Sequence, residues 1–537
     1  MMRYFKLGRL KNYLAIIVLL LIGFLIRFND LGAQSFWFDE TISSIAAIAI
    51  LEKGSPVFSS GHLYSRGILN TVSIAASFKI FGINEFAGRL PSVLFGTLMI
   101  PLVYLIGSKW GNKRIGIIAA ILVTFSIWEI AWSRQARMYQ QLQFFYILSL
   151  YLFYEFVTNK NLKNGLLVFF SVLCAIMSHI FGYALIVVFL IYMLVSILKE
   201  RRSLDTIWNR TSALLVLILI SSLAFSYYKG VIHTVLNTDI NYYNTYIHLL
   251  KNDLGLFLFI AVPGGTVLVN RDWKKGLLLI SALLIPLYFI FFHVLLLGTR
   301  YLYFIIPILF ILIGFFLDFI ADYMGHSLSE LRARLLQKKV FQTNTRKNAG
   351  ANMIRIFRNL LNIKNPYRRI LNADTIVILF LLIAMYLSPA FTFTPNEEYY
   401  LGVNAPQSNF KDAYIYVNEN MQADDVIVSA WTAPSQFYLG KSDYWLAVNV
   451  DGRGPEPYLM GNSTRDVYTN ATAIFDVDGL KEVVEQNERG WIVVDKLGWY
   501  KLRPSMKEFI AENLTTHVNS GERNAVNVYG WKNETKN

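Results

Sequence analysis

The 537-residue chain has a single cysteine, Cys174, and comparatively few charged residues. One cysteine excludes an intrachain disulfide and any metal site built on several thiolates. Asp, Glu, Lys and Arg make up 16% of the residues, whereas soluble domains carry about 25%. Hydrophobic residues make up 55% and gather in long runs through the first three quarters of the chain. These features indicate a polytopic α-helical membrane protein rather than a β-barrel, whose short alternating segments are absent.

Eleven segments are candidate membrane spans. An ideal span needs about 20 residues, and several of these segments are shorter. The basic N-terminus ahead of Leu14–Ile26 could belong to a signal peptide, but the many spans behind it favour a retained first helix with a cytoplasmic N-terminus. The candidate spans cover residues 13–28, 90–107, 115–132, 140–158, 164–178, 180–198, 212–228, 253–269, 276–297, 301–320 and 373–390.

This topology places every strongly basic loop on the cytoplasmic side, as the positive-inside rule requires. The longest of these loops, 321–372, carries eleven Lys and Arg and is interpreted as a charged loop on anionic lipid. A membrane crossing at 67–82 would reverse the later loops. That segment has only 16 residues, with polar residues at helical spacing, so we expect an amphipathic helix on the outer surface. Residues 28–89 then form one large external loop.

The composition changes after the last span. Residues 392–537 contain 13 Lys and Arg against 20 Asp and Glu. Segments 424–431 and 490–496, and more weakly 524–531, read as strands with helices between them. We therefore expect a membrane module, residues 1–391, followed by a small external α/β domain. The net charge of +14 belongs to the membrane module and its cytoplasmic loops, and does not indicate a nucleic acid partner.

Charged residues that are expected outside and near the bilayer form a small, informative set. Arginine presents a planar fork to phosphate oxygens, so such a set suggests chemistry on an anionic, membrane-borne substrate. Transfer of a sugar from a lipid phosphate would need cations at the leaving group and a carboxylate base for the acceptor. The set includes two adjacent acids in the segment SFWFDE, and its members are Asp39, Glu40, Arg66, Arg89, Arg134, Arg137, His179 and Arg300.

Structural interpretations of the same residues stay open. Arg89 could be an interfacial anchor or a helix-end cap. Arg134 and Arg137 would share a helix face, and one of them could simply pair with a carboxylate, which leaves Arg137 as the favoured functional residue. Arg300 could be a snorkelling anchor, His179 could be a packed interface residue, and the two acids could cap a helix start. No His or Cys cluster has metal-ligand spacing, so we expect no metal and no other cofactor.

Four segments together resemble the GT-C superfamily of membrane glycosyltransferases, of the protein O-mannosyltransferase and aminoarabinose transferase type. Their order and spacing along the chain carry the resemblance, which ends with the last of them. The segments are FWFDE after the first span, FGINEFAGRLPSVLFGTLMIPLVYLIG leading into and through the second, SRQARMY after the third and RYLYFIIP at the start of a late span.

The resemblance implies an inverting transfer from a polyprenyl-phosphate sugar at the outer face, with Asp39 as the base and Glu40 beside it. It also implies a basic residue that contacts the lipid phosphate after the first surface helix. Many relatives carry K-P-P or H-P-P there, whereas this chain reads GHLYSRG, so His62 or Arg66 could fill the place. The other candidates are Arg134, Arg137 and Arg300 for the donor phosphate and Trp37, Tyr139, His179 and Tyr301 for the substrates.

The expected partners are a polyprenyl-phosphate sugar donor, membrane lipids, and an acceptor that is a lipid, a glycan or a protein. The expected location is the plasma or inner membrane, crossed many times, with the C-terminal domain outside. A transporter or flippase of a lipid-linked glycan is the alternative function. It would favour charged residues in the middle of spans, and the expected spans hold few. A receptor or scaffold would not need arginines gathered from several loops.

Overall fold

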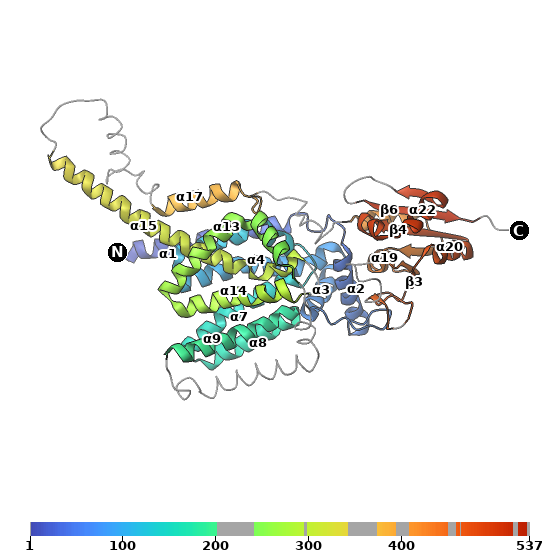
Figure 1. Cartoon of the computed structure of the whole chain (residues 1–537), viewed down its shortest axis with the longest axis horizontal. Coiled ribbons are helices and arrows are strands. Elements are labelled where there is room, and N and C mark those ends of the chain that lie inside the picture. The colour runs from blue at the N-terminus through green and yellow to red at the C-terminus, as the bar shows by residue number, and fades with distance from the viewer. Residues whose placement is uncertain are drawn as a thin grey trace, which may run out of the picture.

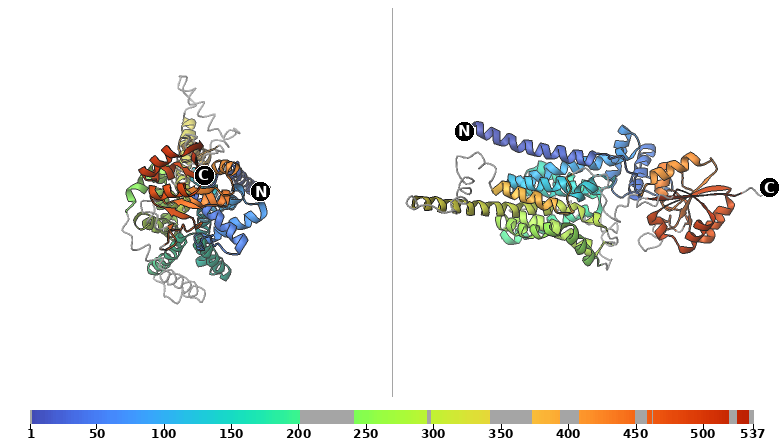
Figure 2. Two further views of the ribbon diagram at one scale, coloured as in Figure 1. Left: turned by 90° about the vertical axis from the view of Figure 1, so that its right-hand side faces the viewer. Right: turned by 90° about the horizontal axis from the view of Figure 1, so that it is seen from above.

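The computed structural model describes residues 2–200, 241–294, 298–341, 373–393, 408–448, 458–461, 463–518 and 525–533. A bundle of long helices forms one part of the molecule, and a smaller domain built from the C-terminal residues lies at one end of it (Figure 1). The two helices of the first loop lie between the bundle and this domain (Figures 1 and 2). Residues from the beginning of the chain therefore contact residues from its end.

Helices occupy ten of the eleven expected spans, and the remaining one, 212–228, lies outside the described residues. By length and composition, five helical segments of the described chain can cross a membrane: Glu85–Trp110, Ile180–Lys199, Leu254–Arg271, Trp273–Phe292 and Tyr303–Ser327. The total of eleven spans stays a prediction. The bundle helices are α1 (Met2–Phe28), α4 (Glu85–Trp110), α5 (Lys113–Phe125), α6 (Ile127–Ser133), α7 (Tyr139–Asn159), α8 (Leu162–Ser178), α9 (Ala184–Glu200), α13 (Tyr243–Arg271), α14 (Trp273–Phe292), α15 (Ile306–Phe341) and α17 (Ala373–Tyr386).

The third expected span, 115–132, is not one helix but is divided into α5 and α6 at Ser126, whose backbone is extended. The chain after α17 pairs with this break, because the N–H of Ile127 donates to the carbonyl of Ala390 at 2.9 Å and that of Thr392 to the carbonyl of Phe125 at 2.9 Å. Backbone groups released from a helix inside a membrane protein need such internal partners. The pairing explains why an apolar segment can tolerate the break.

Two helix contacts depend on glycine. A Cβ added at Gly107 of α4 would lie 2.8 Å from the Cα of Gly116 in α5, and one at Gly264 of α13 would lie 1.9 Å from the carbonyl oxygen of Leu312 in α15. Small residues let helix backbones approach closely, which is a principal source of stability between helices in lipid. These contacts hold the helices that surround the site described below.

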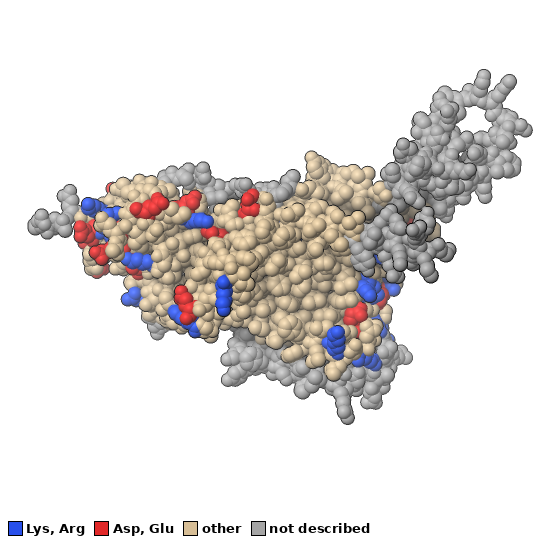
Figure 3. All heavy atoms as spheres, turned by 180° about the vertical axis from the view of Figure 1, so that it is seen from behind, with Lys and Arg blue, Asp and Glu red and all other residues tan. Residues whose placement is uncertain are grey.

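A broad band of the bundle surface carries no Lys, Arg, Asp or Glu on the face shown in Figure 3, whereas charged side chains appear at both ends of the molecule. Large apolar side chains project from the bundle, including Phe259 and Val262, which are 78% and 73% exposed. An exposed apolar belt of this kind matches a lipid environment.

Helix α15 extends past the expected end of its span at 320 and continues to Phe341. The expected basic loop, 321–372, therefore begins with about six turns of helix, and its residues 342–372 lie outside the described part. The sequence LSELRARLLQKK in this extension is rich in residues with high helix propensity. The sequence interpretation ended the helix where the hydrophobicity ends, but charge alone does not stop a helix.

The first loop contains two helices, α2 (Phe38–Lys53) and α3 (Ile68–Phe81). In α3 the polar side chains of Asn70 and Ser77 are buried, whereas Ile80 and Phe81 are 72% and 50% exposed. Ile74 and Phe78 are buried beside these polar side chains, and Lys79 is exposed. Apolar residues therefore lie on both sides of α3, which lacks the separate polar and apolar faces that the sequence interpretation expected of an amphipathic helix.

The C-terminal domain is a six-stranded sheet in the order β3-β2-β1-β4-β6-β5. The first four of these strands run parallel, and the last two pair antiparallel with their neighbours. Strands β1, β4 and β6 overlap the three segments that the sequence predicts as strands. The strands are β1 (Val426–Ser429), β2 (Tyr444–Leu446), β3 (Thr472–Ile474), β4 (Arg489–Asp495), β5 (Thr515–Val518) and β6 (Val526–Lys532), with helices α18 (Phe410–Asn420), α19 (Thr432–Leu439), α20 (Val477–Gln486), α21 (Lys496–Lys501) and α22 (Pro504–Asn513).

Candidate functional site

The candidate site lies where the first turn of α2 meets the α6–α7 connection and the short 3-10 turn η2 (Thr299–Tyr301). One carboxylate oxygen of Asp39 lies 3.5 Å from a guanidinium nitrogen of Arg137 and 3.5 Å from one of Arg300. The Asp39 side chain is 20% exposed, whereas the Arg137 side chain is 7% exposed. Three segments that are far apart in the sequence thus bring one acid and two arginines together.

Arg137 is held by the backbone and side chains of the first loop. Its guanidinium donates to the carbonyl of Asp39 at 2.8 Å, to the hydroxyl of Ser43 at 2.9 Å and to that of Tyr64 at 3.4 Å. Burial alone would lower the pKa of Arg137, but Asp39, Tyr64 and the neighbouring Tyr139 raise it above its usual value. Arg137 therefore stays charged, and its hydrogen bonds to Asp39 and Ser43 fix its guanidinium against the first turns of α2.

Each of the two arginines keeps a buried Nε–H that has no hydrogen-bond acceptor among the residues that the structure describes. Burial disfavours the charge of Arg300, but Tyr139, Tyr301 and Asp39 together hold its pKa above its usual value. A buried donor without a partner is costly. An anion with several acceptor oxygens would give both guanidinium groups the partner that they lack.

Three aromatic candidates surround the arginines. The ring of Tyr139 lies 5.6 Å from that of His179 and 6.3 Å from that of Tyr301, with an edge-on geometry to the latter. Burial, together with the charges of Arg137, Arg300 and Arg66, lowers the pKa of His179 to about 3. The imidazole is therefore neutral, and it accepts a hydrogen bond from the N–H of Phe181 at 3.3 Å.

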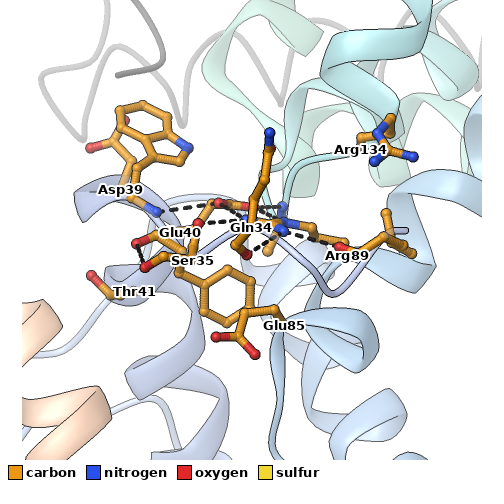
Figure 4. Close-up of polar contacts among 12 residues, drawn as sticks. Gln34, Ser35, Asp39, Glu40, Thr41, Glu85, Arg89 and Arg134 are labelled. Carbon is orange, nitrogen blue, oxygen red and sulfur yellow. Dashed lines mark hydrogen bonds and ion pairs between the residues drawn. The ribbon is translucent and has the colours of Figure 1, made fainter. Parts of the chain in front are cut away.

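Glu40, which the sequence groups with Asp39, occupies a different environment. Its two carboxylate oxygens accept hydrogen bonds from Arg89 at 2.9 and 2.8 Å, and further ones from the N–H of Ala136 at 2.7 Å and of Trp37 at 3.4 Å. In Figure 4, Glu40 and Arg89 point toward one another, whereas Asp39 points away from them. The Glu40 side chain is 1% exposed. Adjacent helical residues point about 100° apart, so only Asp39 faces the arginines of the site.

Arg134 does not join Arg137. Residues 134–138 form turns and bends rather than the helix that would place both arginines on one face. The Arg134 guanidinium instead donates to backbone carbonyls at the C-terminal end of α1, among them that of Arg27 at 2.9 Å. Arginine often binds the unpaired carbonyls at a helix end. In this structure Arg134 therefore ties α1 to α6, and its expected place among the phosphate ligands is not supported.

Arg66 and His62, the two candidates for the basic residue after the first surface helix, lie in different environments. Arg66 is exposed and forms no hydrogen bond or ion pair with any residue in the described ranges, yet its charge acts on His179 and on Tyr468 of the C-terminal domain. His62 is exposed and stacks on Phe58 with ring centres 6.4 Å apart. The structure brings Arg66 toward the site and gives His62 no comparable contact. Trp37 is buried at the N-terminal end of α2.

A buried polar network that the sequence analysis missed supports the two arginines. Glu129 of α6 accepts from Gln143 of α7 at 2.9 Å and from the Tyr303 hydroxyl at 3.1 Å. Gln140 and Gln143 are also joined to each other at 3.0 Å, and Tyr303 contacts Gln140. The network links the helices on either side of Arg137 with the turn after Arg300. Glutamines one turn apart, beginning next to SRQARMY, were the available sequence signal.

An apolar cavity of about 440 Å³ lies beside η2. Helices α13, α14 and α15 form its walls, and Leu302, Ile305 and Ile306, which follow Arg300 closely in the chain, line one side. Val262 of α13 and Leu284 of α14 also line the cavity and are 73% and 55% exposed. The wall that these two helices form therefore reaches the lipid-facing surface. The charged site and an apolar space therefore adjoin each other through the segment after Arg300.

Comparison with known proteins gives matches over part of the sequence and over most of the fold. Residues 66–225 match the family described as dolichyl-phosphate-mannose-protein mannosyltransferase. An uncharacterized protein of Aquifex aeolicus is 28% identical over 157 residues, which are 28% of this chain and 31% of that protein. The chain thus matches about a third of the length of this relative.

Two crystal structures of ArnT from Cupriavidus metallidurans match almost the whole chain. The apo form gives a TM-score of 0.61 at 12% identity over 96% of this chain and 97% of ArnT. The chain has the fold of the GT-C membrane glycosyltransferases. The form bound to undecaprenyl phosphate gives 0.56 at 15% identity over the same shares. The resemblance that the sequence motifs indicate is therefore confirmed.

A third solved GT-C structure extends the comparison. The Archaeoglobus fulgidus oligosaccharyltransferase, tethered to an acceptor peptide with the NVT sequon, gives a TM-score of 0.56 at 12% identity over 90% of this chain and 69% of that one. In the present chain, no group of three or more His, Cys, Asp or Glu within the described ranges is placed to hold a metal ion. The expectation that no metal or cofactor is needed stays a prediction.

Proposed function

We propose that this protein transfers a sugar from a polyprenyl-phosphate donor to an acceptor at the outer membrane face, with inversion at the anomeric carbon. The observation that carries the proposal is Asp39 held between Arg137 and Arg300 next to an apolar cavity. The GT-C fold and the ArnT structure with undecaprenyl phosphate support a lipid-linked donor.

Arg137 and Arg300 bind the donor phosphate. Both stay charged, both have an unused Nε–H, and their contacts to the Asp39 carboxylate, at 3.5 Å, are long enough for a phosphate to replace them. Arginine binds phosphate in a bidentate manner. Arg66, which is exposed beside the same residues, adds a third positive charge. Together these cations stabilise the negative charge that develops on the leaving phosphate.

Asp39 acts as the base. Its carboxylate takes the proton from the acceptor hydroxyl or amine while the acceptor atom attacks the anomeric carbon. The bond between that carbon and the phosphate oxygen breaks, and the electron pair leaves with the polyprenyl phosphate. A single displacement of this kind inverts the anomeric configuration. Neutral His179, with Tyr139 and Tyr301, offers hydrogen-bonding and ring surfaces for the sugar.

The isoprenoid occupies the apolar cavity among α13, α14 and α15. The cavity begins at Leu302, two residues after Arg300, and one wall reaches the lipid-facing surface. A chain that enters from the bilayer would place its phosphate at the arginines without exposing apolar surface to water. Glu40 and Arg89 do not touch the substrates in this scheme; they hold the start of α2, and with it Asp39, against α4.

Sugar transfer in membranes that contain the full chain tests the proposal. A panel of radiolabelled undecaprenyl-phosphate and dolichyl-phosphate sugars would serve as donors, and lipid and protein extracts of the host as acceptors. We expect label to move with the wild type and with Asp30→Asn but not with Asp39→Asn. Asp30 is a matched control because it is an exposed aspartate of the same loop whose side chain bonds only to Asn29 among the described residues.

The result that contradicts the proposal is equal labelling by membranes with and without the protein for every donor. Movement of a lipid-linked glycan across sealed vesicles, without transfer, would favour the transporter alternative. Equal transfer by the wild type and Asp39→Asn would contradict the assignment of the base and leave the reaction class standing.

A further inference from the structure

The hydroxyl of Tyr438 lies at the junction of the C-terminal domain, the first loop and the bundle. Tyr438 is near the end of α19, far from the first loop in sequence. Its hydroxyl accepts a hydrogen bond from the N–H of Phe36 at 2.8 Å, lies 3.1 Å from the hydroxyl of Ser35, and donates to a carboxylate oxygen of Glu85 at 3.0 Å. A phenol has one proton to donate and two lone pairs. These three partners therefore use its full capacity.

Glu85, at the first position of α4, is itself held on its other oxygen. Its second carboxylate oxygen lies 3.2 Å from the ammonium of Lys411 in α18, and the N–H of Lys411 donates to the hydroxyl of Ser35 at 3.1 Å. Burial and the charge of Glu85 raise the pKa of Tyr438 well above its usual value. The Tyr438 hydroxyl is therefore a neutral donor at neutral pH.

Aromatic contacts from the same domain hold the residues that directly precede Asp39. The fully buried ring of Phe36 lies 5.2 Å from that of Phe437, in an edge-on geometry. Phe38 lies 4.7 Å from Trp431 and 5.9 Å from Tyr468. Every residue from 35 to 38 except Trp37 therefore has a partner in the C-terminal domain.

We propose that Tyr438 is a positioning residue for Asp39, and that the C-terminal domain completes the catalytic loop. The inference rests on the proposed function, because it gives Asp39 the role of base. The backbone N–H of Phe36 is three residues from Asp39 and one residue before Trp37, where α2 begins to form. Fixing this amide to the C-terminal domain sets the first turn of α2 relative to Arg137 and Arg300. A small displacement of a catalytic group lowers the rate far more than it lowers substrate binding.

Tyr438→Phe tests the inference because it removes the hydroxyl and keeps the ring. Tyr500→Phe is the matched control, since Tyr500 is in the same domain and 80% exposed. Hydrogen–deuterium exchange of the purified full chain is the first measurement and needs no activity. We expect exchange in the peptide that covers 35–45 to become about fivefold faster, with no change in the peptide that covers 68–81, because one hydrogen bond is lost.

Kinetics of sugar transfer are the second measurement. We expect Tyr438→Phe to lower kcat about tenfold and to leave the KM for the polyprenyl-phosphate sugar within about twofold. Ser35→Ala removes the other hydroxyl of the junction and should give the same split with a smaller drop in kcat. This second variant keeps the test valid if Tyr438→Phe folds poorly.

Unchanged exchange at 35–45 in both variants, or faster exchange with an unchanged kcat, would overturn the positioning role and leave the proposed function intact. Equal losses of binding and rate would also overturn it, because they would indicate general destabilisation. Absence of transfer by the wild type with every donor of the panel would instead overturn the proposed function, and with it the catalytic part of this inference.

Discussion

Asp39 and Asp318 each face two arginines that come from distant parts of the chain, but they lie at opposite ends of the bundle and have different environments. Asp318 in α15 is completely buried. It accepts hydrogen bonds from Arg271 at 2.7 Å and from Asn112 at 2.8 Å, and it also pairs with Arg114. The short contacts tie the beginning of α5 and the end of α13 to α15.

Asp39 has the same types of partner with looser geometry. Both of its arginine contacts measure 3.5 Å, and its side chain is 20% exposed. A fully bonded buried acid holds elements together, and its partners are not free to bind anything else. An acid with long, partly exposed contacts can give up its arginines to an incoming phosphate. The contrast indicates that contact length and exposure, rather than residue types, separate a structural cluster from a reactive one.

Asp39→Asn should give the largest effect on activity. A small effect would contradict the distinction between the Asp39 cluster and the Asp318 cluster. The amide keeps the shape and some hydrogen bonding but cannot accept the acceptor's proton, so we expect transfer to fall by about 10²- to 10⁴-fold. Initial rates with a saturating radiolabelled donor would measure the change. Asp318→Asn is the matched control, and the surviving protein should transfer at close to the wild-type rate per folded molecule.

Asp318→Asn should instead give the largest loss of stability. Removing its charge leaves Arg114 and Arg271, among the described residues, with the more exposed Asp322 as their acidic partner. We therefore expect a loss near the lower end of the about 3–5 kcal/mol that breaking a buried ion pair typically costs. Thermal unfolding of the purified protein in detergent would show a lower Tm for Asp318→Asn than for Asp39→Asn. An equal Tm for both variants would contradict the distinction between the two clusters.

Arg300→Lys should have an intermediate effect on sugar transfer, and it tests whether the arginines of the Asp39 cluster bind the donor while those of the Asp318 cluster do not. Lysine keeps the charge but loses the planar fork, so we expect the KM for the donor to rise about tenfold with a smaller change in kcat. Arg271→Lys, at the other end of the bundle, should leave the donor KM unchanged. Similar KM values for the two variants would argue against a phosphate ligand at Arg300.

The sequence predicts the positions of the helices well because each rests on a local apolar run. It also locates SFWFDE and RYLYFIIP, the segments that carry Asp39 and Arg300. It cannot tell Asp39 from Glu40, because the choice depends on Arg89, which lies 49 positions away and is bonded to Glu40.

The other differences have the same origin in long-range contacts. Arg134 and Arg137 diverge because the segment between α6 and α7 is not helical, although their spacing fits a helix face. The network around Glu129 and Tyr303 joins three segments, and no segment alone shows that its polar side chains meet those of the other two. Tyr438 reaches the first loop only through the docking of the C-terminal domain, which no local periodicity encodes.

His179 should produce the smallest effect, which appears as a pH dependence of stability. Its pKa in the folded protein is lowered to about 3, whereas an unfolded histidine titrates near 6.5. Between these values the unfolded chain binds a proton that the folded chain does not, so stability falls as the pH falls from about 6.5 toward 3. Between pH 7 and pH 5 the loss of stability is at most about 2 kcal/mol.

His179→Gln should therefore show a smaller drop in Tm between pH 7 and pH 5 than the wild type, measured by thermal unfolding in detergent. His248→Gln, at an exposed histidine of α13, should retain the wild-type drop. The same drop in His179→Gln would contradict a neutral imidazole beside the arginines, and with it the role of His179 as an uncharged surface for the sugar.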